Sequence, residues 1–75
     1  VQGRYEVDFI IEAGRFCMAL ELKSAARWQA KDLTGLKAFL KATPHCKAGI
    51  LCHNGEEAVQ LGERLWALPI GLDLS

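Results

Sequence analysis

The sequence predicts an α/β (α+β) domain built on a mixed β-sheet, and three observations support this class. An alternation of apolar and polar residues runs through residues 5–12 and again through residues 15–23, which is typical of two half-buried strands. Apolar residues then recur at helical spacing within residues 30–43. Short apolar runs follow at residues 48–53 and 65–70. We therefore expect a central hairpin, one main helix and further strands.

The two alternating segments are predicted to pair as a hairpin because their apolar residues match. With a two-residue turn at residues 13–14, Phe9 faces Met18 and Ile11 faces Phe16. A slip of one residue would place apolar side chains opposite polar ones, so the pattern specifies the pairing.

The helix is predicted from Leu33, Leu36 and Leu40, which share one face, and Pro44 marks its end. A helical crossover would make the strand at residues 48–53 parallel to the second hairpin strand, if both belong to one sheet.

The last third of the chain is expected to turn back on itself. Asn54-Gly55 is a favoured hairpin turn, after which residues 56–61 could pair back with residues 48–53. One or two further strands are therefore expected after residues 48–53. Pro69 lacks a backbone donor and is expected to lie at a sheet edge.

The polar face of the hairpin holds the candidate chemistry. In the expected register Asp8 lies diagonal to Glu21, Glu6 lies opposite Glu21, and Lys23 follows on the same face. Convergent carboxylates repel unless a cation compensates, and Mg²⁺ or Mn²⁺ suits carboxylate oxygens. An adjacent lysine can stabilise an anionic transition state. The alternative is that these charged residues form an ordinary solvated face.

An ordered series of motifs resembles the PD-(D/E)xK nuclease superfamily. More specifically, it resembles the carboxy-terminal domain of bacterial and archaeal AAA-type P-loop ATPases. An Asp in one strand precedes Glu-x-Lys in the next, followed by a helix and a buried strand. The matching segments are EVDFII at residues 6–11, ALELKSAA at 19–26, DLTGL at 32–36, GEE at 55–57 and GERLWALPI at 62–70.

The resemblance implies a restriction-endonuclease-like core, in which Asp8 and Glu21 bind the metal and Lys23 is the catalytic lysine. Val7 stands where the superfamily motif has proline, which is a minor departure. A helix and a first strand usually precede the hairpin in this core and do not fit into residues 1–4. The resemblance also implies an ATPase module, and this chain contains no Gly-rich phosphate loop. Residues 1–75 are therefore expected to be a single partial domain, the carboxy-terminal nuclease-like module of a larger protein.

Composition limits the partners. Nine basic and nine acidic residues give a formal net charge of zero, so a DNA contact must come from a local patch. No apolar run approaches the length of a membrane span, and nothing resembles a signal peptide. Three cysteines without a CxxC pair argue against a disulfide scaffold and favour the cytoplasm. The chain begins with Val1 rather than Met, which also favours a larger functional unit.

Other residues could in principle bind zinc or nucleic acid, but structural roles are favoured for them. Zinc binding by the histidines and cysteines at positions 45–46 and 52–53 is disfavoured, because an extended segment separates the two pairs. Cys17 is expected to pack beneath the helix. The helix lysines, with Arg27 and Trp28 nearby, could bind phosphates and stack a base, but a solvated helix face is favoured.

Two functions from different classes remain open at this point. The first is a nuclease module of an ATPase that hydrolyses DNA phosphodiesters with Mg²⁺. The second is a non-catalytic module that keeps the fold, binds DNA or protein, and is coupled to the ATPase. Missing upstream elements would expose sheet edge or apolar surface, so a homodimer or strand exchange is also expected.

Overall fold

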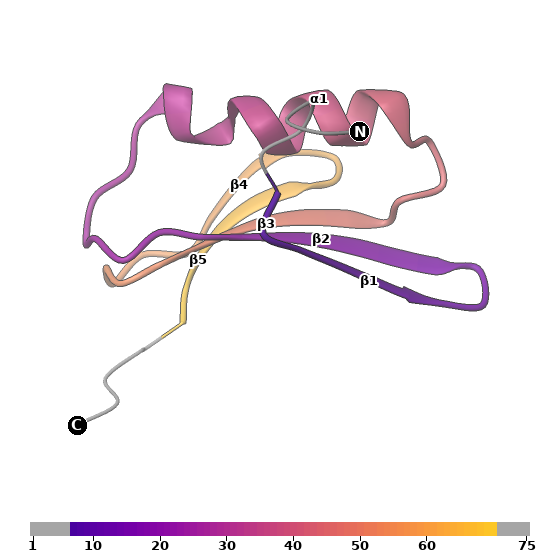
Figure 1. The fold of residues 1–75 in the computed structure, drawn as a ribbon. Helices are drawn as coiled ribbons and strands as arrows, with labels where there is room; N and C mark the ends of the chain where they lie inside the picture. Colours follow the sequence, from indigo (N-terminus) through magenta and orange to yellow (C-terminus); the bar gives the residue numbers. More distant parts are fainter. Residues whose placement is uncertain (1–6, 71–75) are drawn as a thin grey trace.

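The computed structural model describes residues 7–70, which form one five-stranded mixed sheet with helical structure on one face (Figure 1). The strand order is β1-β2-β3-β5-β4. The predicted α/β class, the hairpin and the single main helix are confirmed, but the hairpin is not central, because β1 is an edge strand of the described sheet. The elements are β1 (Phe9–Ala13), β2 (Phe16–Leu22), the 3-10 turn η1 (Ala30–Leu33), α1 (Thr34–Ala42), β3 (Ala48–His53), β4 (Val59–Gly62) and β5 (Leu65–Pro69).

The β1–β2 hairpin is antiparallel as predicted, but its register differs by two residues. Phe9 pairs with Leu20 and Ile11 pairs with Met18. Gly14 has a φ of 62°, and a glycine with positive φ at the first central position is the requirement of a type II′ turn. The turn is therefore centred on residues 14–15 rather than 13–14. Because the shift is an even number, every side chain keeps its predicted face.

The crossover through η1 and α1 makes β2 and β3 parallel, as predicted, with Leu20 beside Ile50. The hairpin that the Asn54-Gly55 turn would have allowed between β3 and residues 56–61 does not form. β3 pairs in parallel with β5, and β4 pairs only with β5 among the described strands. The backbone after β3 is bonded elsewhere: the N–H of Asn54 donates to the carbonyl of Ala25, and the N–H of Gly55 donates to His53 Nδ1. These bonds lead the chain away from β3.

Pro69 lies in an inner strand, so its expected position at a sheet edge is also wrong. It pairs with His53 at the end of β5, whereas the pairing of β4 with β5 stops at Val59 and Ala67. The N–H of Ile70 donates to the carbonyl of His53, so the adjacent Pro69 nitrogen points to the other side, beyond β4. Proline is tolerated there because its missing donor has no strand to meet.

The helical layer covers the face of the sheet that carries small side chains. Cys17 and Ala19 are fully buried beneath it, with Leu51, Leu65 and Ala67 from the inner strands. A Cβ added at Gly49 would lie 2.9 Å from Leu40 Cδ1, so glycine at this position allows close contact between α1 and β3. Leu33, Leu36 and Leu40 face this core as their spacing predicts.

The opposite face of the sheet is apolar and is not covered by any described element (Figure 1). Phe9 is 53% exposed, and Ile11, Phe16 and Leu22 are each more than 40% exposed. Leu20, Ile50 and Trp66 continue this face across the inner strands and are half-buried. The alternation in the hairpin therefore marks two different surfaces: a small-residue face under the helix and a bulky apolar face that is open.

Candidate functional site

The three predicted site residues lie near the end of β2, Glu21 and Lys23 along the chain and Asp8 across the hairpin, although Asp8 does not line the pocket described below. Asp8 lies at a bend immediately before β1, and continuing the observed register by one position places it opposite Glu21. Its carboxylate Oδ2 accepts a hydrogen bond of 2.8 Å from the backbone N–H of Leu22. The Asp8 carboxylate therefore lies beside the peptide between Glu21 and Lys23. Glu6, the other acidic residue expected here, lies outside the described residues.

Glu21 and Lys23 line a pocket between the end of β2 and the start of the helical layer, which also includes Ser24, Lys31 and Asp32. The Oε1 atom of Glu21 is buried from solvent. Lys23 Nζ lies 3.4 Å from Asp32 Oδ1, and the backbone N–H of Lys23 donates to the carbonyl of Cys52 in β3. The pocket is therefore built from two acidic and two basic side chains.

Asp32 is an acidic member of this pocket that was not among the predicted site residues. Its Oδ2 accepts a hydrogen bond of 2.8 Å from the N–H of Gln29, which caps the start of η1. That hydrogen bond lowers the pKa of the Asp32 carboxyl below its usual value, and Lys23 lowers it further. Asp32 is thus held as an anion beside Lys23. A signal was available in the sequence, since Gln29-x-x-Asp32 precedes the apolar helical pattern as a capping motif does.

The residues that were given structural roles mostly have them. His53 is buried; its Nδ1 accepts from the N–H of Gly55, and its Nε2 donates to the carbonyl of Glu57 at 3.1 Å. Both ring nitrogens are thus satisfied by the backbone. Trp28 is half-buried against the core, so it is not a free stacking platform. Among the cysteines, Cys17 packs beneath the helix as expected.

A second group of side chains escaped the sequence reasoning because its members are distant in the chain. Glu12, Cys17 and His45 bring one carboxylate oxygen, one sulfur and one ring nitrogen within 4.8 Å of one another. Spacing in the sequence groups His45 only with Cys46, Cys52 and His53. The observed pairing of Glu12 with Cys17 follows from the two-residue register shift.

Fold and pocket together define a small α/β module with a charged pocket at the end of a mixed sheet. The chain belongs to the family described as a domain of unknown function, DUF4143, whose model matches residues 1–72. No curated protein and no solved structure gives a match. The helices formed within residues 7–70 are too short or too polar to cross a membrane.

Proposed function

We propose that this chain is the nuclease-like module of a larger ATPase and binds Mg²⁺ or Mn²⁺ for phosphodiester hydrolysis on DNA. The observation that carries the proposal is the hydrogen bond from Leu22 to Asp8, because it brings a carboxylate from the bend before β1 beside the backbone of Glu-x-Lys. The proposal that the larger protein is an ATPase rests on the resemblance of the motif series to the carboxy-terminal domains of AAA-type ATPases. The module would act in the cytoplasm, where the three free thiols stay reduced.

The donor set fits a hard divalent cation. Asp8 and Glu21 offer carboxylate oxygens, which such cations prefer. One hydrogen bond leaves the Asp8 carboxylate with further acceptor capacity, since a carboxylate has about four lone-pair sites. When bound, the cation would supply charge neutralisation on a phosphate oxygen and a more acidic water.

Lys23 would stabilise the negative charge that builds up on the phosphate in the transition state. In this structure it pairs with Asp32, and the pair is partly exposed to solvent. Such pairs are worth about 0–1 kcal/mol, so Lys23 can leave Asp32 for a phosphate at little cost. Asp32 would then hold Lys23 at the pocket until the nucleic acid arrives.

A calorimetric titration with Mg²⁺ and Mn²⁺ tests this site. Replacing Asp8 by Asn should weaken cation binding by at least about tenfold, because ligand charge sets the affinity of such sites. The fold should survive, since the Asn oxygen can still accept from Leu22. Lys23→Met should leave cation binding unchanged and abolish DNA cleavage by the intact protein, because the lysine acts on the transition state.

Glu56→Gln is the matched control, since it removes an exposed carboxylate that lines a different pocket from that of Glu21 and Lys23, and it should change nothing. If wild type and Asp8→Asn titrate identically, or wild type shows no saturable site, the nuclease proposal is abandoned.

The open apolar face favours a second candidate, a non-catalytic module that binds protein through this face. A second copy of the chain is the partner we infer, because Phe9, Ile11, Phe16 and Leu22 carry no charge and two such faces are complementary. Monomeric soluble proteins rarely expose an apolar surface that extends over several neighbouring side chains, as this face does.

Light scattering over a range of concentrations tests this second candidate. Wild type should double its mass as concentration rises, and Phe9→Lys should remain monomeric because a buried unpaired charge is costly. Ala42→Lys adds the same charge at the exposed end of α1 and should dimerise as wild type does. A wild type that stays monomeric throughout would exclude the second copy as the partner.

A further inference from the structure

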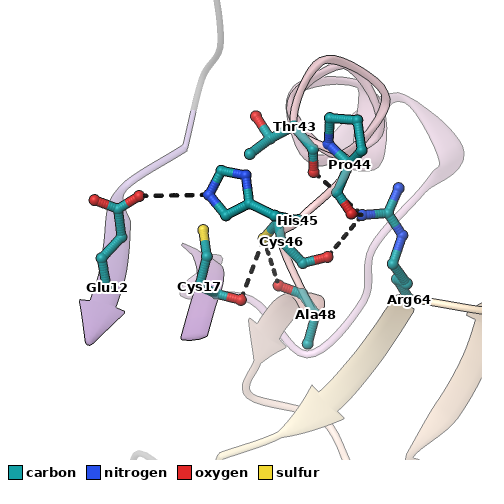
Figure 2. Close-up of polar contacts among 8 residues, drawn as sticks. All are labelled: Glu12, Cys17, Thr43, Pro44, His45, Cys46, Ala48 and Arg64. Atoms are coloured by element: carbon teal, nitrogen blue, oxygen red, sulfur yellow. Dashed lines mark hydrogen bonds and ion pairs between the residues drawn. The ribbon is translucent and has the colours of Figure 1, made fainter. Parts of the chain in front are cut away.

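A mixed group of side chains with metal-ligand atoms lies beside the hairpin turn, at the other end of β2 from the Asp8–Glu21 site. Figure 2 shows this group. Glu12 is in β1, Cys17 is its partner in β2, and His45 is in the loop that follows α1. Glu12 Oε2 and His45 Nε2 lie 3.9 Å apart. In Figure 2 the Cys17 thiol points toward the His45 ring. Three separate elements therefore aim different donor atoms at one point.

The loop that carries His45 is held in place by Arg64. Its guanidinium donates hydrogen bonds to the carbonyls of Thr43 and Pro44, each at 3.2 Å, and to that of Cys46 at 2.6 Å. The N–H of Lys47 donates to the carbonyl of Cys17, which ties the same loop to β2. The positions of His45 and Cys17 are thus coupled through backbone bonds. A loop fixed in this way pre-organises its side chains for a ligand.

The dimensions of the group suit a small ion. Donor atoms around a tetrahedral zinc ion lie about 3.3–3.8 Å apart, given bond lengths of about 2.0–2.3 Å. The donor atoms lie within 4.8 Å of one another, so binding requires the widest pair to contract by about 1–1.5 Å at most. Glu12 and His45 can supply this movement because each side chain is 63% exposed. Cys17 is the rigid member, since it is fully buried.

The donor types select the metal. Thiolate and imidazole favour zinc and related transition metals, whereas Mg²⁺ prefers oxygen ligands alone. Cys46 is not needed in the ligand set, because its thiol donates to the carbonyls of Cys17 and Ala48. The ligand set therefore consists of one carboxylate, one thiol and one imidazole. Three protein ligands with a fourth position open is the arrangement of catalytic rather than structural zinc sites.

We propose that Glu12, Cys17 and His45 bind a zinc ion with an open fourth coordination position. This site is separate from the one at Asp8 and Glu21 and does not depend on the nuclease proposal. The sulfur ligand would be Cys17 Sγ, the nitrogen ligand His45 Nε2 and the oxygen ligand a Glu12 carboxylate oxygen. The open position would take water or an anionic or thiol ligand.

Binding at this site should release a proton. Burial raises the pKa of the Cys17 thiol to about 11, and the adjacent Cys46 thiol adds to the effect. Cys17 is therefore a neutral thiol at neutral pH in the metal-free protein. A metal ion binds the thiolate, so the thiol proton must leave as the metal enters.

Titration with Co²⁺ as a spectroscopic substitute for Zn²⁺ tests the proposal. Wild type should develop a thiolate-to-cobalt charge-transfer band that saturates at one metal ion per chain, and about one proton should be released. Added Zn²⁺ should remove the band by displacement. Cys17→Ser should lose the band and bind Zn²⁺ more than about 100-fold more weakly, which exceeds the usual effect of changing a residue behind the ligands.

His45→Ala is the second variant, because His45 is exposed and its loss does not disturb the core. It should weaken binding while circular dichroism stays as in wild type. Cys52→Ser, at a buried thiol in β3, and Lys47→Ala, at an exposed neighbour of the site, are the controls and should bind as wild type does. A cobalt complex without the thiolate band, or equal affinity in wild type and His45→Ala, would overturn the proposal.

Discussion

Replacing Leu36 by Ala is expected to lower the free energy of unfolding by about 3 kcal/mol, within the usual range for a buried leucine. Leu36 is fully buried at the centre of the contact between α1 and the sheet, among Leu33, Leu40 and Leu51. The small residues of β2 beneath it cannot move to fill the space, because Ala19 lies in a strand that is paired on both sides. A cavity should therefore remain.

The loss of stability in Leu36→Ala should be a large fraction of the total free energy of unfolding. At about 0.05–0.15 kcal/mol per residue, a domain of this size has only about 4–11 kcal/mol of stability. Urea denaturation followed by circular dichroism measures the change. Lys37→Ala, at the next position on the exposed side of α1, is the control and should shift stability by less than about 0.5 kcal/mol. Equal effects at Leu36 and Lys37 would mean that α1 does not pack on the sheet as described.

Replacing Arg64 by Met is expected to cost about 2 kcal/mol and to loosen the end of α1. Besides its bonds to the loop, the guanidinium donates to the carbonyl of Leu40 at 3.0 Å. It therefore binds the backbone carbonyls left over at the end of a helix, where a positive charge is also favoured by the helix dipole. Methionine keeps much of the side-chain length and removes every donor.

Hydrogen exchange of the backbone amides measures this effect locally. The N–H groups of Thr43 and Cys46, which donate to the carbonyls of Leu40 and Thr43, should exchange faster in Arg64→Met. Arg64→Lys should be intermediate, since lysine keeps the charge but not the planar set of donors. Arg27→Met is the matched control at an exposed arginine and should leave both amides unchanged. Unchanged exchange in Arg64→Met would show that the loop is held by other contacts.

Local patterns predicted the elements because each pattern reports the geometry of its own segment. Alternation with period two identified the hairpin strands, and leucines at helical spacing identified the buried side of α1. The crossover through the helix also predicted the parallel pairing of β2 with β3. The placement of Asp8, Glu21 and Lys23 at one end of the hairpin follows from the same alternation. Their roles in metal binding and catalysis stay predictions.

The errors concern contacts that local patterns do not contain. Asn54-Gly55 is a favourable hairpin turn in isolation, but here β5 lies beside β3, where Leu65 and Ala67 become buried under the helix. The turn at Gly14 moved by one residue because a positive φ is required at one position of the turn. These outcomes depend on which surfaces gain most from burial, and that comparison involves the whole sheet.

By itself, the sequence determined the types of the main elements, the two faces of the hairpin and the position of Asp8 near Glu-x-Lys. Only the tertiary structure decided the strand order, the pairing of Lys23 with Asp32 and the meeting of Glu12, Cys17 and His45. It also decided that the helix covers the small-residue face and leaves the bulky apolar face open. The physical reason is that α1 can approach the sheet closely only over Cys17, Ala19 and Gly49, whereas Phe9 and its neighbours would hold it away.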